Sequence, residues 1–150
     1  KAIINHRPIS TTRELATLVE NTTHYKKSSK QKIHPATLTF QAIRIAVNDE
    51  LEQLKKVLNL VHSLLEARSG KLAVISFHSL EDRIVKNHIR DNSSLKPRER
   101  WSLEEDTHPL WLQINKKVIR PSPQEISINP RSRSARLRVA QAIAIEEDMK

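Results

Sequence analysis

A short apolar run between two helical patterns constrains the fold more than any other feature of this sequence. Residues 72–77 (LAVISF) are typical of a strand buried on both faces, as in a parallel sheet covered by helices. A helical pattern precedes this run, and another follows it to about Arg90. The order helix, strand, helix predicts half of an α/β unit, with the helix over residues 48–67 as the crossover.

The helical pattern before the strand starts at Pro35, a residue that suits a first helical position. Its apolar residues recur every three or four positions and form one stripe through to Ala67: Phe40, Ile43, Val47, Leu51, Leu54, Leu58, Val61 and Leu65. Asn48 and Asp49 offer a cap, so two helices are an alternative to one. Gly70 stands where a left-handed residue is expected to end the helix.

The N-terminal segment predicts one more helix. Thr11 and Glu14 have the spacing of a capping box, which favours a helix over residues 12–21. Residues 22–34 and 92–109 are polar and lack periodicity, so we expect loops there.

The C-terminal third predicts strands. Residues 110–118 alternate between apolar and polar and predict a half-exposed strand. Residues 119–134 hold three prolines, and we expect no regular element there. Alternation from Arg136 to Val139 predicts a last strand, in a sheet whose edge turns antiparallel. Among the aromatic residues, Phe40 and Phe77 fit core positions.

Composition excludes several classes of protein. The chain has one glycine, and a dinucleotide-binding or Walker A loop needs at least two. It has no cysteine, which excludes disulfides, thiolate metal sites and a cysteine nucleophile. No apolar run approaches the ~20 residues of a membrane span, and no signal peptide is visible. We therefore expect a cytoplasmic protein that makes no contact with a membrane.

The net charge of +9 is unevenly spread. Residues 1–47 hold eight Lys and Arg against two Glu, residues 48–129 are nearly balanced, and four arginines crowd residues 131–138. Two basic patches flanking a neutral middle favour a nucleic-acid partner. The alternative is a basic protein that its charge keeps soluble.

The polar turn after the apolar run is a candidate ligand site. His78, Ser79 and Asp82 lie where a buried strand ends and a helix begins, an edge at which α/β sheets bind ligands. The alternative is a capped turn, with Ser79 as the N-cap and acidic residues near the helix dipole. A Ser-His-Asp hydrolase is disfavoured because these residues are crowded together without a G-x-S-x-G turn. A metal site is disfavoured because the seven histidines lack ligand spacing.

Residues 129–136 form an arginine cluster stiffened by Pro130. Guanidinium groups bind phosphates through two parallel hydrogen bonds, so the cluster favours contact with a nucleic-acid backbone. A solvated basic tail is the alternative. The five aromatic residues include no pair typical of base-stacking RNA modules. We therefore expect the chain to contact RNA mostly through its phosphates and to recognise its shape.

Three motifs in this order resemble one family, the small-subunit ribosomal RNA cytosine-N4 methyltransferases of the MraW or RsmH type. The motifs are HPATLTFQAIRIAVNDEL at 34–51, ISFHSLEDRIVK at 75–86 and NPRSRS at 129–134. The resemblance implies an α/β fold, a Rossmann-like methyltransferase domain dependent on S-adenosylmethionine (SAM), into which a helical substrate-recognition domain is inserted. By position, residues 1–47 resemble the rear part of the insertion. Residues 48–150 resemble the C-terminal half of the Rossmann-like domain.

The resemblance also implies an activity, methylation of the N4 amine of a cytosine in small-subunit ribosomal RNA, and assigns roles to residues. The candidate catalytic residues are His78, Ser79 and Asp82. The candidate RNA-binding residues are Arg44, Arg83, Arg131 and Arg133. It implies no metal.

The cofactor half of the family pattern has no counterpart here. The glycine-rich loop, the acidic ribose ligand and the first strands of the family precede the matched part. Residues 67–70 stand in place of a Pro-Gly-Gly type of turn. No cofactor-binding residue is therefore carried over to this chain.

Two other functions stay open at the sequence level. One is a non-catalytic RNA-binding fragment that lacks the cofactor site. The other is a half-enzyme that pairs with a separately supplied front half. A sheet of about three strands exposes an unpaired edge, so we expect a second copy in a homodimer, or a partner half, to cover it.

Overall fold

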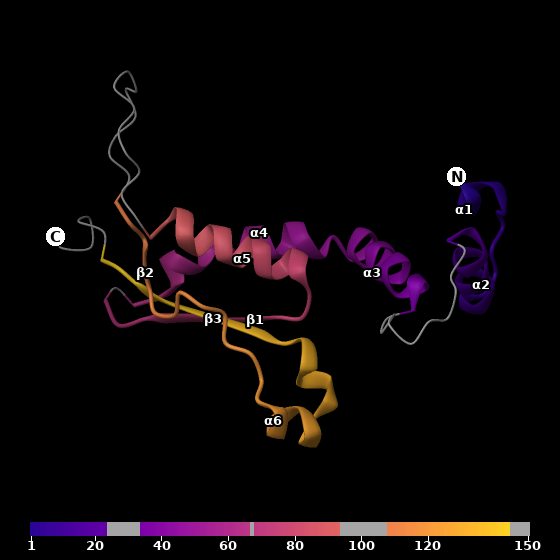
Figure 1. Ribbon diagram of the computed structural model, residues 1–150. Coiled ribbons are helices and arrows are strands. Elements are labelled where there is room, and N and C mark those ends of the chain that lie inside the picture. The colour runs from indigo at the N-terminus through magenta and orange to yellow at the C-terminus, as the bar shows by residue number, and fades with distance from the viewer. Residues whose placement is uncertain (24–33, 67, 94–107, 145–150) are drawn as a thin grey trace, which may run out of the picture. The chain divides into compact units, whose positions relative to one another are not determined.

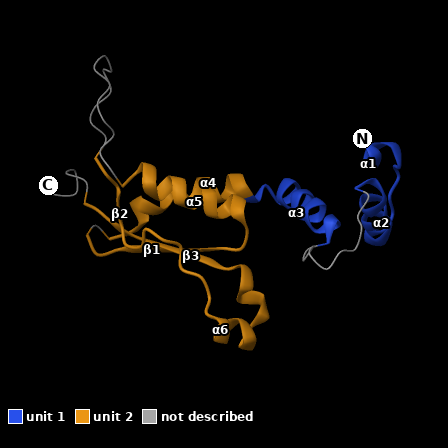
Figure 2. Cartoon of the chain, viewed as in Figure 1, with its two compact units in different colours: residues 1–50 blue, residues 51–150 orange. Residues whose placement is uncertain are grey.

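The computed structural model describes residues 1–23, 34–66, 68–93 and 108–144. The chain divides into two compact units, residues 1–50 and residues 51–150, coloured separately in Figure 2. Most of the two expected loops, as well as Tyr25 and Trp101, lies outside the described residues. None of the described helices is long and apolar enough to cross a membrane.

The first unit consists of helices α1 (Ala2–Asn5), α2 (Thr12–Thr22) and α3 (Pro35–Asn48). The predicted cap of α2 is confirmed, because the Glu14 amide donates to Thr11 Oγ1 at 3.1 Å. The Glu14 carboxylate accepts from the Ser10 amide at 2.9 Å. The first bond satisfies an amide that the first helical turn leaves free, and the second ties the residue before the cap to the helix, so the helix starts where the spacing predicts.

The helical stripe is interrupted at Asp49, which adopts a left-handed conformation with φ of 52°. Helix α4 (Glu50–Val61) follows, and the short 3₁₀ helix η1 (His62–Leu64) comes next. The alternative of two helices is therefore confirmed, and a single helix through to Ala67 is wrong. One left-handed residue ends the hydrogen-bond ladder of α3 even though the apolar spacing continues.

Gly70 has a different role from the one predicted. Its φ is not positive, and the left-handed residue in this turn is Arg68, with φ of 69°. A Cβ atom at position 70 would lie 2.7 Å from the Glu66 carbonyl oxygen and 2.8 Å from Leu65 Cβ. Glycine is required because the chain packs closely against the preceding turn, where no side chain fits.

The second unit contains a three-stranded sheet in the order β1-β3-β2 (Figure 1). Its strands are β1 (Lys71–Ser76), β2 (Trp111–Gln113) and β3 (Arg136–Ala142), and both pairings are antiparallel. The three predicted strands and the antiparallel edge are confirmed, but the parallel pairing expected for the first strand is wrong for the described residues, where β1 pairs antiparallel with β3. The second strand is shorter than residues 110–118, and its continuation is a single bridge between Ile119 and Leu137.

Helix α5 (Ser79–Asp91) packs along one face of this sheet (Figure 1). The other face leaves Ile75 and Phe77 more than half exposed. The predictions that the first strand is buried on both faces and that Phe77 is a core residue are therefore wrong for the described residues. The apolar run predicted burial, but only alternate residues of a strand face the same side.

The core of the second unit is centred on Trp111, which is completely buried. The other buried core residues come from α4, α5 and the sheet: Leu58, Leu72, Val85, Ile89, Ala140 and Ala142. The indole lies edge-on to His62, with ring centroids 5.1 Å apart, and its Nε1 donates to His88 Nε2 at 3.2 Å. The half-exposed strand predicted over residues 110–118 gave no sign that Trp111 is buried, so its central role was missed.

The proline-rich residues 119–134 contain two short helices, and the expectation of no regular element is wrong. They are α6 (Pro123–Ile128) and the 3₁₀ helix η2 (Pro130–Ser134). Pro123 and Pro130 occupy first-turn positions, where no amide is needed. The Ser122 hydroxyl accepts from the Glu125 amide at 3.1 Å and caps α6.

Candidate functional site

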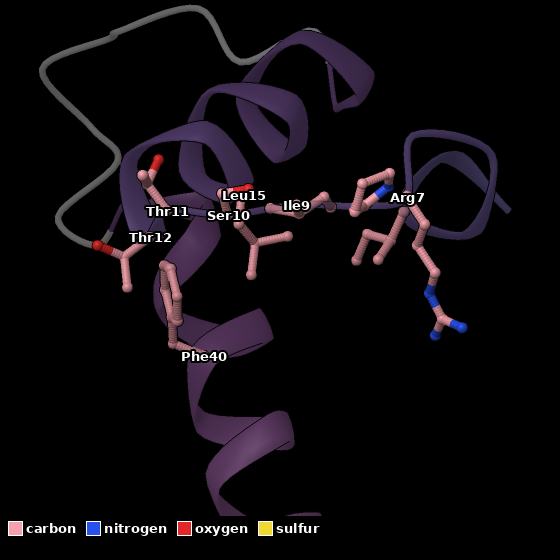
Figure 3. Close-up of a pocket in the computed structure, with 9 residues that line it drawn as sticks. Arg7, Ile9, Ser10, Thr11, Thr12, Leu15 and Phe40 are labelled. Atoms are coloured by element: carbon pink, nitrogen blue, oxygen red, sulfur yellow. The ribbon is translucent and has the colours of Figure 1, made fainter.

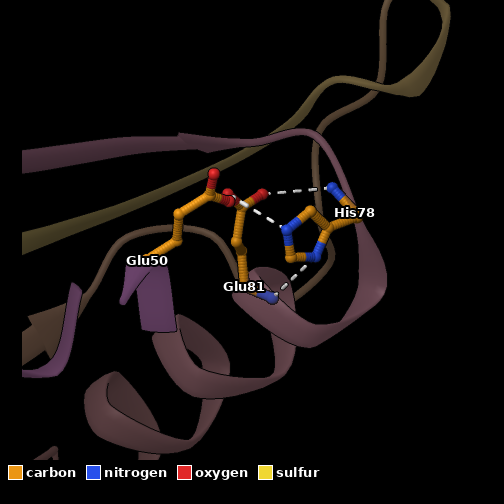
Figure 4. Close-up of side chains that lie close together, drawn as sticks. All are labelled: Glu50, His78 and Glu81. Carbon is orange, nitrogen blue, oxygen red and sulfur yellow. Dashed lines mark hydrogen bonds and ion pairs between the residues drawn. The ribbon is translucent and has the colours of Figure 1, made fainter. Parts of the chain in front are cut away.

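The turn between β1 and α5 is a capping box built on histidine (Figure 4). The Glu81 amide donates to His78 Nδ1 at 3.3 Å. The Glu81 carboxylate accepts from the amides of Phe77 at 2.9 Å and His78 at 3.2 Å. The prediction that Ser79 is the N-cap is therefore wrong, since Ser79 is the first helical residue and its side chain is exposed. Its hydroxyl is accessible to a ligand at this strand end.

His78 has a second ring nitrogen that the cap does not use. Nε2 is buried without a hydrogen-bond partner among the described residues, and Glu81 Oε1 lies 3.3 Å away. Because Nδ1 accepts the amide, the neutral ring carries its proton on Nε2. The imidazole is therefore held in one orientation by its cap, and its second nitrogen lies beside the Glu81 carboxylate.

Asp82 is bound by arginine rather than free for acid–base chemistry. Arg138 Nε donates to Asp82 Oδ1 at 2.7 Å, and its Nη2 donates to Oδ2 at 3.2 Å. The hydrogen bond from Arg138 lowers the pKa of Asp82; burial opposes this, and the charges of Arg138, Arg136 and Arg120 add to the lowering. The carboxylate therefore stays ionised, and the ion pair joins the first turn of α5 to β3.

The candidate RNA-binding arginines lie in three places. Arg83 is exposed near the start of α5, and Arg131 and Arg133 are exposed on η2. Arg44 is exposed on α3 in the first unit, where its Nε lies 2.8 Å from Glu50 Oε1. Helix η2 leads directly into β3, so the structure connects the arginine motif to the strand that holds Asp82.

Arg120, Arg136 and Arg138 also belong to this region, although no sequence motif indicated an individual role for them. Arg136 Nη1 lies 3.7 Å from Asp82 Oδ2, and the Arg138 side chain is almost completely buried. Alternation in the predicted strand put Arg136 and Arg138 on the same side, a signal that this side faces a carboxylate. The partner itself was hidden, because Asp82 lies 56 residues earlier in the chain.

The first unit has a separate open cavity of about 760 Å³ (Figure 3). It is lined by Ile3, Arg7, Pro8, Ile9, Ser10, Thr11, Thr12, Leu15 and Phe40. Phe40 is only partly buried and lines this cavity, so the prediction that it is a core residue is wrong.

These features define a basic α/β protein with a polar strand end and arginines beside it. A model of the MraW methylase family matches residues 1–143, and the chain belongs to that family.

Curated relatives carry the name ribosomal RNA small subunit methyltransferase H. The protein of Dehalococcoides mccartyi is 48% identical over 145 residues, which cover 95% of this chain and 40% of that protein. The protein of Lawsonia intracellularis is 47% identical over 150 residues, covering 97% and 48%. The protein of Rickettsia africae is 45% identical over 151 residues, covering 95% and 48%. The chain thus spans less than half the length of these relatives.

Proposed function

We propose that this chain is part of a SAM-dependent methyltransferase that modifies the N4 amine of a cytosine in small-subunit ribosomal RNA. The observation that carries the proposal is the family match over residues 1–143, together with relatives named as ribosomal RNA methyltransferases. The +9 net charge supports a polyanionic substrate. A ribosomal substrate also supports a cytoplasmic location.

The finer domain assignment is part of the same proposal. Residues 48–150 form the C-terminal half of a Rossmann-like domain, and residues 1–47 form the rear of a helical insertion. The succession α4, β1, α5 supports the first assignment, and the all-helical first unit supports the second.

The residues of this chain do not fit a SAM site. Family members bind the cofactor with a glycine-rich loop, whereas the one glycine here, Gly70, is required for packing against Glu66 and Leu65. The cofactor therefore has no assigned ligand in residues 1–150, and we derive no step through it.

What this chain contributes is the positioning of the target base. The lone pair of the cytosine amine is delocalised into the ring, so a polar acceptor is needed to orient the amine. The base must also leave its stack to reach a pocket. His78 and Ser79 present polar groups at the strand end, and orientation of reactants contributes up to about 7–11 kcal/mol in well-aligned reactions. Asp82 is assigned a positioning role, since its ion pair with Arg138 fixes the turn that carries both residues.

The role of His78 is tested by replacing it with asparagine in the full-length protein. Asparagine is a good N-cap, so we expect His78→Asn to lower the methylation turnover at least tenfold while the unfolding midpoint changes little. Turnover is measured with labelled SAM and small-subunit RNA, and stability is measured by urea unfolding.

His78→Ala is the matched control, because it removes both the imidazole and the cap. It is expected to lose about 1 kcal/mol of stability in addition to the turnover. If His78→Asn retains wild-type turnover, His78 has only a capping role.

A non-catalytic RNA-binding fragment is the second candidate, favoured by the lack of fit to the cofactor. Calorimetry with SAM distinguishes it from an enzyme that is complete in this chain. We expect no specific binding of SAM to residues 1–150, and micromolar affinity would place a cofactor site in this chain.

If mixing with a separately supplied front half restores methylation, the half-enzyme interpretation is supported. Sedimentation tests whether a second copy covers the free edge of β1.

A further inference from the structure

Two arginines, Arg120 and Arg136, follow in register from one backbone bridge at the end of the sheet where α5 begins. Ile119 and Leu137 exchange two backbone hydrogen bonds, at 3.1 and 2.9 Å. In an antiparallel pairing the residues one step further along are also opposite, which brings Arg120 beside Arg136. Like charges in directly opposed positions destabilise a sheet.

The carboxylates near this pair are already engaged. Arg138 uses both oxygens of Asp82, and Arg136 reaches only one of them, at 3.7 Å. The Glu81 carboxylate accepts from backbone amides in the β1–α5 turn. Asp82 is therefore contacted by both Arg136 and Arg138, and Arg120 acts on it only through its charge.

The Arg136 side chain is 24% exposed, and its buried Nε has no hydrogen-bond partner among the described residues. Arg120 is exposed, and its charge reaches Asp82, where it contributes to the lowered pKa of that carboxyl. A half-buried cation with incomplete pairing costs free energy, and such local conflicts mark functional positions. A solvated surface accounts for Arg120 alone, but it does not account for Arg136.

We propose that Arg120 and Arg136 together bind a phosphate group of the RNA backbone, an inference that rests on the proposed function. Two adjacent guanidinium groups offer paired donors that match the oxygens of a phosphodiester. Arg136 is paired in register with Ser76, the last residue of β1, so the bound phosphate lies at the same strand end as His78 and Ser79. An added negative charge also relieves the repulsion between the two arginines.

The experiment measures RNA binding by the chain carrying Arg120→Gln or Arg136→Gln. The probe is a fluorescent oligonucleotide of small-subunit ribosomal RNA sequence, titrated at several salt concentrations. We expect each variant to bind about tenfold more weakly. The slope of log affinity against log salt should fall by about 0.7–0.9 for the lost phosphate contact.

Arg90→Gln is the control, since Arg90 is an exposed arginine in the last turn of α5, away from the proposed site, where it pairs with Asp91. It should leave both affinity and salt slope unchanged. Urea unfolding checks that each variant folds. If Arg136→Gln does not fold, Arg120→Gln decides, because the exposed Arg120 is not one of the arginines in contact with Asp82.

The outcomes separate this inference from the proposed function. If wild type binds the RNA and both variants behave like Arg90→Gln, the phosphate site is wrong and the RNA partner stands. If wild type binds no RNA but inorganic phosphate raises its melting temperature through Arg120 and Arg136, the anion site is supported. The assignment of the bound phosphate to RNA, and with it the proposed RNA substrate, is then wrong. If neither ligand binds, the inference is overturned.

Discussion

Replacing Trp111 with alanine is expected to remove about 3–5 kcal/mol from the free energy of unfolding of residues 51–150. The indole is completely buried among residues from two helices and the sheet. Its removal leaves a large cavity and also deprives His88 of its hydrogen bond. Urea unfolding followed by circular dichroism measures the loss.

Two variants serve as controls for Trp111. Trp111→Phe keeps an aromatic ring but loses the N–H donor, so its loss should be clearly smaller. Leu112→Ala changes the neighbouring residue, which faces the opposite side of β2 and is 57% exposed. It should cost no more than about 1 kcal/mol. If Trp111→Ala is as mild as Leu112→Ala, the core is not centred on the indole.

Asp82→Asn is the second substitution with a large expected effect, a loss of about 3 kcal/mol. It keeps the shape of the side chain and removes its charge, so the buried Arg138 guanidinium loses the carboxylate to which it makes two hydrogen bonds. The free energy of unfolding at pH 7 measures the effect. Asp91→Asn is the control, because Asp91 pairs with Arg90 at an exposed site of the same helix.

The pH dependence of stability provides an independent check on this ion pair. The Arg138 hydrogen bond lowers the pKa of Asp82 in the fold, whereas the unfolded chain has a value of about 3.9. The pair therefore stabilises the protein above about pH 4, and this contribution is lost as the pH falls through the lower folded pKa. Asp82→Asn should remove this part of the acid destabilisation.

His88 affects the pH dependence of stability at a higher pH than Asp82 does. This effect of His88 should persist in the Asp82→Asn variant. Burial lowers the pKa of His88 below its usual 6.5, so protonation favours the unfolded chain as the pH falls below that value. If Asp82→Asn shows the wild-type loss of stability below pH 4, the proposed ion-pair contribution is wrong.

Local sequence signals predicted most of the elements. Thr11 with Glu14 and Pro35 correctly marked the starts of α2 and α3, because caps and first-turn prolines act within a few residues. The same kind of signal was present at Ser122 and Pro123, yet the density of prolines led to the wrong expectation there. At Gly70 the prediction failed because the constraint is contact with the preceding turn and not a backbone angle.

The sequence predicted the position of the candidate site more accurately than the role of each of its residues. The sequence placed His78, Ser79 and Asp82 together at a strand end, and the structure confirms that location. It then separates them into a capping imidazole, an exposed hydroxyl and a carboxylate held by arginine. Their roles depend on hydrogen bonds whose partners the local pattern does not reveal.

The sequence by itself determined the family, the helix caps, the three strands and the uneven basic charge, because these depend on residues near one another in the chain. Only the tertiary structure decided which residues form the core and which charges pair. The bond from Arg138 to Asp82 joins residues 56 apart, and the bond from Trp111 to His88 joins residues 23 apart. Such contacts form only when β3 and β2 come together beside α5, and no periodicity along the chain specifies which partner a side chain meets.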